Sequence, residues 1–360
     1  MHLLRNFANV KKQAYFLPYT LQFKRPSGTS RGVLKTKDTW FIVIQHNDQM
    51  GIGECGMFKG LSVDDVVDFE EKLQWACDHI NLGLDPLLEE LDAYPSIQFG
   101  LEIAFRSLGS TDQFELFASN FTESNEAIPI NGLIWMGTKQ FMKEQIKTKI
   151  SEGFNCIKMK IGAIDFDTEL GLLRSIRKEF SSADIELRVD ANGAFDPSNA
   201  LEKLKQLSDY DLHSIEQPIK QGQWDDMAYL CEKTPLPIAL DEELIGVVDH
   251  NKKSSLLDII NPQFIILKPT LVGGFQGSLS WIDLAEERQI GWWITSALES
   301  NIGLNAIAQW TYTLKNGLPQ GLGTGGLFTN NFDSPLVVKN GTLRYENKLN
   351  WDISNLNLKL

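Results

Sequence analysis

Cysteine and histidine are scarce in this chain of 360 residues, and neither is spaced as in a redox or zinc-binding motif. The five histidines show no His-Glu-x-x-His pattern, and the four cysteines form no Cys-x-x-Cys pair. We therefore expect reduced, partly buried thiols rather than disulfides or zinc ligands. The cysteines are Cys55, Cys77, Cys156 and Cys231.

An excess of positive charge and long apolar runs are also lacking. The chain has 34 Lys and Arg against 47 Asp and Glu, and its formal net charge of −13 argues against nucleic-acid binding, which needs clustered basic side chains. No uninterrupted run of 18 apolar residues occurs, so we expect no membrane-spanning helix. The first residues lack the cationic and apolar segments of a secretory signal. These absences predict a cytoplasmic protein that acts on a small molecule.

The beginning of the chain predicts a separate α+β domain, which we place at residues 1–95. Strand patterns at residues 15–23, 32–45 and 50–55 have the spacing of an antiparallel meander. Helical patterns follow, the first of them at residues 63–80. Strands followed by helices are typical of an α+β domain.

From Pro129 onward, eight short apolar segments alternate with amphipathic ones, which predicts a (β/α) barrel over residues 96–330. The tail, residues 331–360, again reads as strands, with Asn340-Gly341 as a hairpin turn, and should return to the first domain. The expected barrel strands are Ile130–Trp135, Cys156–Ile161, Glu186–Asp190, Ser214–Glu216, Pro237–Leu240, Phe264–Lys268, Gly291–Thr295 and Gln320–Gly323.

Five charged residues recur at nearly constant spacing, each at the end of one of these apolar segments. The intervals between them are 30, 26, 25 and 27 residues, close to the length of one strand–helix unit. In a (β/α)₈ barrel the carboxyl ends of all strands surround one mouth, so these side chains should converge in one pocket. They are Lys160, Asp190, Glu216, Asp241 and Lys268.

The three acidic members of this set, Asp190, Glu216 and Asp241, predict a metal site. Oxygen ligands without His or Cys suit a hard divalent cation, which we expect to be Mg²⁺, with Mn²⁺ as a substitute. The alternative is that each acid caps a helix or lies on the surface. Three acids in register at successive strand ends disfavour that alternative.

The lysines supply the acid–base chemistry. Lys158 and Lys160 alternate around Met159, so both point to the same side of a strand. Near a metal, each should depress the pKa of the other through like-charge repulsion and desolvation, as a general base near neutral pH requires. Lys268 closes the ring from the opposite side. Lone Lys-x-Lys pairs are mostly solvated, so this interpretation depends on the neighbouring acids.

Two further segments offer small polar groups to a substrate carboxylate. Residues 320–326 are rich in glycine, and backbone N–H groups around Gly323 could hold an anion. Residues 296–303 offer Ser296 and Ser300 near the expected seventh strand. Plain turns are an equal alternative for both segments. No Lys-Ser or Lys-Thr follows the glycines, so nucleotide binding is not expected.

These motifs resemble the enolase superfamily over nearly the whole chain. The resemblance implies an α/β fold, a modified TIM-type barrel with an N-terminal α+β capping domain that the C-terminal tail completes. It also implies that Mg²⁺ is bound by the three acids, that Lys160 is the base and that Lys268 stabilises developing negative charge. Lys158, Arg188 and Asn192 are expected to support these groups. The motifs are Lys158-Met-Lys160, Asp190-Ala-Asn192, Glu216-Gln-Pro218, Asp241-Glu242 and Lys268.

Within the branch that has a lysine on each side of the metal, the sequence is most similar to hydro-lyases of menaquinone biosynthesis. Their reaction is the dehydration of 2-succinyl-6-hydroxy-2,4-cyclohexadiene-1-carboxylate to 2-succinylbenzoate, and residues 27–31 would then close over the mouth. The alternative is a dipeptide epimerase or an N-acylamino-acid racemase with the same lysines. Dipeptide epimerases typically show Asp-x-Asp at the eighth strand, where this chain has Gly323-Thr-Gly325. A metal-bound scaffold without catalysis is disfavoured, because buried charges cost stability unless paired.

Overall fold

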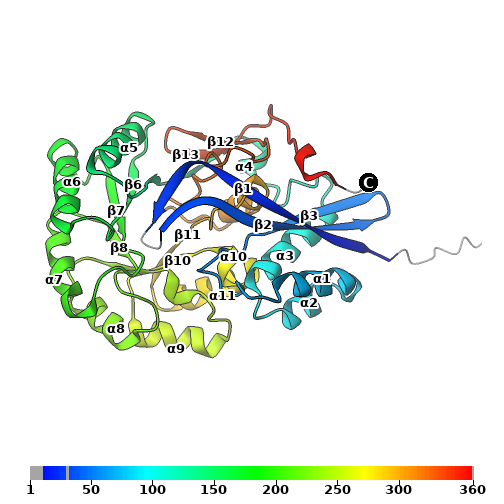
Figure 1. Ribbon diagram of the computed structural model, residues 1–360, viewed down its shortest axis with the longest axis horizontal. Coiled ribbons are helices and arrows are strands. Elements are labelled where there is room, and N and C mark those ends of the chain that lie inside the picture. The colour runs from blue at the N-terminus through cyan, green and yellow to red at the C-terminus, as the bar shows by residue number, and fades with distance from the viewer. Residues whose placement is uncertain (1–10, 30–31, 359–360) are drawn as a thin grey trace, which may run out of the picture.

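The computed structural model describes residues 11–29 and 32–358 and divides their strands among three sheets. Figure 1 shows a barrel of strands and helices on one side and a sheet with helices on the other. In the described part of the chain, no helix combines the length and the apolar character needed to cross a bilayer.

The N-terminal sheet is the predicted antiparallel meander, in the order β1-β2-β3. Figure 1 shows the long hairpin of β1 and β2 reaching from this sheet toward the barrel. Strand β3 and helix α3 approach each other closely through glycines. A Cβ on Gly53 would lie only 1.9 Å from the backbone oxygen of Gly100, so only glycine fits there. The elements of this part are β1 (Gln13–Thr29), β2 (Gly32–His46), β3 (Gln49–Cys55), α1 (Phe69–Asp78), η1 (Ile80–Leu82), α2 (Leu84–Glu90) and α3 (Pro95–Gly109).

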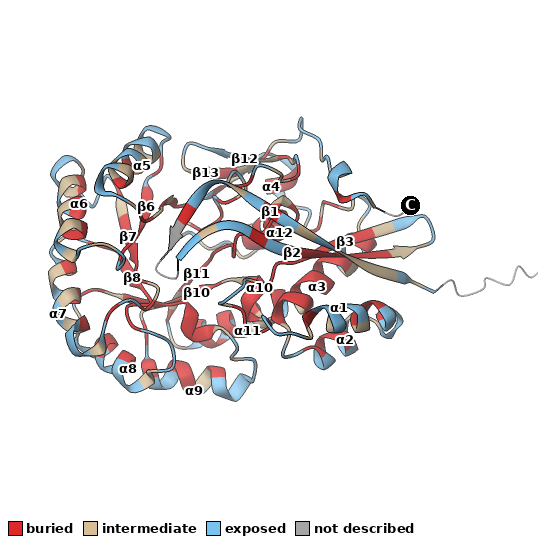
Figure 2. Cartoon of the chain, viewed as in Figure 1, coloured by how far each residue is buried: buried red, intermediate tan, exposed pale blue. Residues whose placement is uncertain are grey.

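The barrel contains seven parallel strands, paired in the order β11-β10-β9-β8-β7-β6-β5. Figure 2 shows the helices around them with buried inner faces and exposed outer faces, as amphipathic sequences require. The strands are β5 (Gly132–Ile134), β6 (Cys156–Lys160), β7 (Glu186–Asp190), β8 (Ser214–Glu216), β9 (Ile238–Leu240), β10 (Phe264–Leu267) and β11 (Gly291–Ile294). The helices that follow them are α5 (Lys139–Ser151), α6 (Phe166–Glu179), α7 (Pro197–Ser208), α8 (Trp224–Lys233), η2 (Glu242–Leu244), α9 (His250–Ile260), α10 (Pro269–Val272), α11 (Gly274–Glu287) and α12 (Asn301–Thr313).

The expected eighth strand, Gln320–Gly323, is not a regular strand. Its first two residues make isolated bridges to the two edges of the sheet, Gln320 to Ile130 and Gly321 to Thr295. The side chain of Gln320 replaces part of the missing ladder, because its Oε1 accepts a hydrogen bond from the N–H of Ile294 at 2.7 Å. Two residues therefore close a barrel of seven strands.

The expected strand Ile130–Trp135 is shorter in the structure, where β5 spans Gly132–Ile134. Directly before it, β4 (Ala127–Pro129) belongs to another sheet and pairs with β13 (Thr342–Tyr345) of the tail. Strands β12 (Leu336–Lys339) and β13 form the predicted hairpin around Asn340 and Gly341, both at positive φ. The short helices are α4 (Asn120–Glu123) and η3 (Ser354–Leu356).

The tail contacts the N-terminal sheet after this hairpin. Leu356 is buried in one apolar cluster with Phe41 and Val43 of β2, and Trp351 packs against the same cluster. The tail thus completes the capping part of the fold, while its hairpin pairs with β4, directly before the first barrel strand.

Candidate active site

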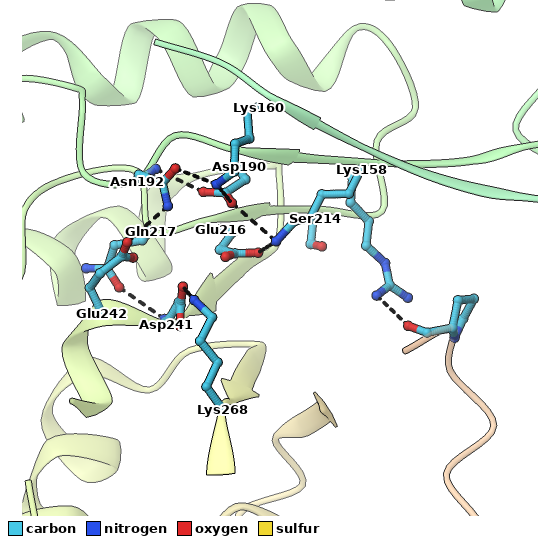
Figure 3. A network of polar contacts seen from close by, with 12 residues as sticks. Lys158, Lys160, Asp190, Asn192, Ser214, Glu216, Gln217, Asp241, Glu242 and Lys268 are labelled. Atoms are coloured by element: carbon cyan, nitrogen blue, oxygen red, sulfur yellow. Dashed lines mark hydrogen bonds and ion pairs between the residues drawn. The ribbon is translucent and has the colours of Figure 1, made fainter. Parts of the chain in front are cut away.

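The five charged residues of the sequence pattern come together at the carboxyl ends of the barrel strands (Figure 3). Lys160 at the end of β6 is in register with Asp190 of β7, which is in register with Glu216 of β8. Asp241 follows β9 and Lys268 follows β10. Lys160, Asp190, Glu216 and Asp241 are buried, and the Lys268 side chain is 11% exposed.

Each lysine of the cluster is paired with a carboxylate. Lys158 Nζ lies 2.7 Å from Glu216 Oε2 and 3.2 Å from Asp190 Oδ2. Lys160 Nζ lies 2.8 Å from the same Asp190 oxygen, and Lys268 forms an ion pair with Asp241. As Figure 3 shows, Lys158 and Lys160 approach the acids from one side and Lys268 from the other.

These pairings shift the pKa values of the cluster. Burial alone would lower the pKa of Lys158, but Glu216 and Asp190 outweigh it and hold that pKa above its usual range. At Lys158 the two nearby carboxylates therefore outweigh the neighbouring lysine. The depressed lysine pKa expected beside a bound metal stays a prediction. Burial and the charge of Asp190 raise the pKa of Glu216, while Lys160 and Lys158 prevail over burial and lower the pKa of Asp190.

As arranged here, no three His, Cys, Asp or Glu side chains in residues 11–29 and 32–358 converge on one point as metal ligands do. The reason is that the acids point at lysines. The chemistry of the donor set nevertheless fits a hard cation, since Asp190, Glu216 and Asp241 offer only anionic oxygens. Glu216 Oε1 is buried without a hydrogen-bond partner, and the Glu216 and Asp241 side chains interact with each other. An unpaired buried carboxylate oxygen is costly, and a cation would satisfy it.

A cavity of about 630 Å³ opens above this cluster. Its walls are apolar on the side formed by Leu34 of β2, Phe58, Trp135, Leu298 and Leu327. Its floor is polar and charged, so a flat acidic molecule could present its carboxylate to the charged end and its ring to the apolar wall. The predicted site residues that line it are Lys158, Lys160, Asp190, Asn192, Lys268, Ser296 and Gly323.

Two of the predicted supporting residues do not line this cavity. Ser300 is fully buried at the start of α12, where its N–H and hydroxyl both donate to Glu54 of β3. Arg188 is buried inside the barrel, where it stacks on Trp293 and donates to the carbonyl of Pro319 at 2.9 Å. Arg188 therefore braces the barrel interior, and Ser300 links the capping sheet to the barrel.

The predicted capping loop, residues 27–31, lies partly outside the described residues. Ser30 and Arg31 are not described, so their closure over the mouth stays a prediction. Leu34, in the strand that follows this loop, does reach the cavity.

Gln217 is a site residue that the sequence reasoning missed. It is fully buried and its backbone has a φ of +39°. Its Oε1 accepts hydrogen bonds from the backbone N–H groups of Asp241 and Glu243 at 3.1 and 3.2 Å. Its Nε2 donates to Glu243 Oε2 at 3.1 Å. Gln217 therefore orients the turn that carries Asp241, and its place directly after Glu216 was the available signal.

Glu242 is a second residue that was not assigned a role. Its Oε1 accepts a hydrogen bond at 3.0 Å from Asn192 Nδ2, and Asn192 Oδ1 in turn accepts one at 2.7 Å from Lys160 Nζ. Asn192 thus connects Lys160 with the turn after β9. Its φ of +45° is tolerated by asparagine better than by most residues.

Comparison with known proteins places this site in a family. Residues 141–348 match the family described as enolase C-terminal domain-like. An o-succinylbenzoate synthase of Desulfotalea psychrophila is 49% identical over 354 residues, which cover 90% of this chain and 96% of that protein. The crystal structure of MenC from the same organism superposes with a TM-score of 0.82 at 44% identity, covering 92% of this chain and 99% of that one.

A more distant structure shares the fold. The dipeptide epimerase of Enterococcus faecalis, solved with Mg and the dipeptide L-Leu-L-Tyr, has a TM-score of 0.80 at 19% identity. It covers 93% of this chain and 97% of its own. By sequence and by fold, the chain belongs to the enolase superfamily and, within it, to the o-succinylbenzoate synthase family.

Proposed function

We propose that this protein dehydrates 2-succinyl-6-hydroxy-2,4-cyclohexadiene-1-carboxylate to 2-succinylbenzoate in menaquinone biosynthesis. The observation that carries the proposal is the 49% identity to an o-succinylbenzoate synthase over 90% of the chain. The lysines that flank the buried acids at the cavity floor support it. We place the reaction in the cytoplasm, because all four cysteines are buried and unpaired, as in a reducing compartment.

Asp190, Glu216 and Asp241 would hold the metal, which we propose to be Mg²⁺, with Mn²⁺ as a substitute. When bound, the cation would stabilise negative charge developing on the substrate carboxylate and would offset the charge of the acids. Asp190, the ion-pair partner of Lys160, is one of these acids, so a bound cation would compete with the Lys160 amine for that carboxylate.

The two lysines that line the cavity would have different roles. Lys160, as the neutral amine, would remove the proton from the carbon that bears the carboxylate. Lys268, protonated and on the opposite side, would stabilise the charge that develops. Lys160, now an ammonium, would return the proton to the departing hydroxyl, so that water leaves and the ring becomes aromatic.

Racemisation or epimerisation is the second candidate. Lys160 and Lys268 both line the cavity, so two bases on opposite faces of a substrate are geometrically available. A hydrophobic dipeptide epimerase of Enterococcus faecalis is 24% identical over 319 residues. Against this reading, Gly323-Thr324-Gly325 offers no carboxylate at the position expected to grip a dipeptide ammonium.

The test is an absorbance assay with the cyclohexadiene carboxylate, in which loss of the diene and appearance of the aromatic product are followed. We expect conversion that requires Mg²⁺, stops on exhaustive chelation and returns on addition of Mg²⁺ or Mn²⁺. Activity that survives chelation would contradict the metal assignment. Folded, metal-supplied protein that does not convert the diene, but exchanges the α-proton of a dipeptide or an N-acylamino acid in deuterium oxide, would favour the second candidate.

A further inference from the structure

A second set of buried charges lies between the capping sheet and the barrel, outside the proposed catalytic groups. It consists of Lys37 in β2, Glu54 in β3 and Glu299 in the segment between β11 and α12. Both glutamates are fully buried and Lys37 is 6% exposed. Charged side chains are rarely buried so completely unless they are paired or functional.

Glu54 fixes the capping sheet to the barrel. Its Oε1 accepts hydrogen bonds at 2.9 Å from both Thr39 Oγ1 and the backbone N–H of Ser300, and its Oε2 accepts one at 2.9 Å from the N–H of Gly303. The carboxylate therefore sits at the N-terminus of α12, where a negative charge is favoured. Glu54 is satisfied by these partners and does not depend on Lys37.

Lys37 is different, because its Nζ is buried without a hydrogen-bond partner. The amine and the Glu299 side chain both lie close to Gly56. A Cβ on Gly56 would lie 3.2 Å from Lys37 Nζ and 3.4 Å from Glu299 Cγ. Burial lowers the pKa of Lys37, while the charges of Glu54 and Glu299 oppose this. Lys37 is the cation that faces these two acids.

On the barrel side, Glu299 contacts the segment that follows Lys268. Its Oε1 accepts a hydrogen bond from the hydroxyl of Thr270. Thr270 belongs to the single helical turn α10, which begins directly after Lys268. The carbonyl of Lys268 accepts a hydrogen bond at 2.7 Å from the N–H of Leu271 in the same turn. A shift of Glu299 would therefore move the backbone that carries Lys268.

Glu299 also holds one wall of the cavity. Its Oε2 accepts a hydrogen bond at 2.8 Å from the N–H of Ala297. Between these two residues, Leu298 lines the cavity with a backbone φ of +64°, a left-handed conformation that is unfavourable for leucine. Such a conformation persists only where its surroundings impose it, and the Glu299 carboxylate is part of that restraint.

We propose that Lys37 is a positioning residue of the active site, whose charge keeps the Glu299 carboxylate in place between Thr270 and Ala297. Docking of the capping hairpin thereby sets the backbone around Lys268 and Leu298. Without Lys37, Glu299 and Glu54 would lack this nearby cation, and repulsion or protonation would loosen the contacts of Glu299. The functional part of this inference rests on the proposed dehydration.

The test is a double-mutant cycle on kcat, with the Mg²⁺-loaded enzyme and the cyclohexadiene carboxylate. The variants are Lys37→Met, Glu299→Gln and the double variant, each assayed well below its unfolding temperature. We expect Lys37→Met to lower kcat by about tenfold or more, because small misplacements of catalytic groups have large effects on rate. In the Glu299→Gln background, the same change should lower kcat by less than about threefold, since the acid that needed the cation is gone.

Lys253→Met is the matched control. Lys253 is equally buried, in α9, and donates to the carbonyl of Gly277 at 3.1 Å, away from the cavity. Its loss should lower the unfolding temperature and leave kcat near the wild-type value. A kcat loss for Lys37→Met that is equal in both backgrounds, or no loss at all, would overturn the proposal.

Failure of the proposed function is recognised separately, because it would leave the wild-type enzyme inactive on the diene. Crystal structures of the wild type and of Lys37→Met then decide the inference without any turnover. A changed backbone at Leu298 and a broken contact between Glu299 and Thr270 would support it. Unchanged positions of Leu298, Thr270 and Lys268 in the variant would refute it.

Discussion

Substitution of Gln217 tests directly how the barrel positions the acidic side chain of Asp241. In Gln217→Ala, the backbone N–H groups of Asp241 and Glu243 lose their acceptor, and a Glu243 carboxylate oxygen loses a donor. These groups are buried, and each buried N–H without a partner costs about 1–3 kcal/mol. For the two N–H groups together, we expect the free energy of unfolding to fall by about 2–6 kcal/mol. If the turn after β9 reorients so that these N–H groups find other acceptors, the loss of stability will be smaller. In that case Asp241 would move with the turn.

The assay is a calorimetric titration of the folded variant with Mg²⁺, alongside chemical unfolding. Loss of a group that orients a metal ligand typically weakens metal affinity by about 10- to 100-fold, and we expect an effect of this size. Gln223→Ala is the matched control, since the Gln223 amide makes one hydrogen bond, at 3.0 Å to the carbonyl of Lys220. Unchanged stability and unchanged Mg²⁺ affinity in Gln217→Ala would refute the reasoning that this side chain positions Asp241.

Three further predictions concern the base, pH and packing. Lys160→Ala should lower kcat by about 10²- to 10⁴-fold with Mg²⁺ affinity retained, measured by turnover and titration, and near-normal kcat would mean that the base lies elsewhere. Burial raises the pKa of Glu102 from 4.5 to about 7, against hydrogen bonds from two backbone N–H groups. Its stabilising contribution is therefore complete below pH 4.5 and is lost as pH rises through 7, which corresponds to about 3 kcal/mol. The difference in unfolding free energy between wild type and Glu102→Gln should change by this amount from pH 4.5 to pH 8, and a constant difference would contradict the assignment. Gly53→Ala should lower the unfolding free energy by at least about 1–3 kcal/mol, because the new Cβ would overlap the oxygen of Gly100, whereas Gly109→Ala, where a Cβ meets nothing within 4 Å, should not.

The convergence of the charged residues was predictable because it depends only on strand direction and on spacing. Once Asp190 and Glu216 are assigned to the ends of neighbouring parallel strands, their register follows. The helix starts at Asp165 and Asp196 follow from local chemistry in the same way, since each side chain accepts a hydrogen bond from the backbone N–H of its own first turn. Features encoded within a few residues are therefore readable from the sequence.

Features that depend on partners far away in the sequence could not be predicted from it. Glu54 contacts Ser300, 246 positions away in sequence, so nothing near Glu54 indicates that it is buried. The pKa of Lys158 depends on how many carboxylates lie within reach, which residue types alone do not specify. The segment at Gln320 had the apolar and small residues of a strand, but closing the barrel required only two residues and one amide side chain.

Because Gln320 and Gly321 close the barrel, the barrel can be completed only after this late part of the chain has been synthesised. The strands that carry Lys160, Asp190 and Glu216 leave the ribosome as a contiguous block, while Gln320 must meet Ile130, about 190 positions earlier. Until that late segment is synthesised, the barrel stays open and the charged strand ends remain in contact with water. The acids and lysines can thus pair, or take up a cation, while still hydrated, and their burial is imposed last. A nascent chain halted before residue 320 should therefore leave these acids more exposed to solvent than they are in the complete protein.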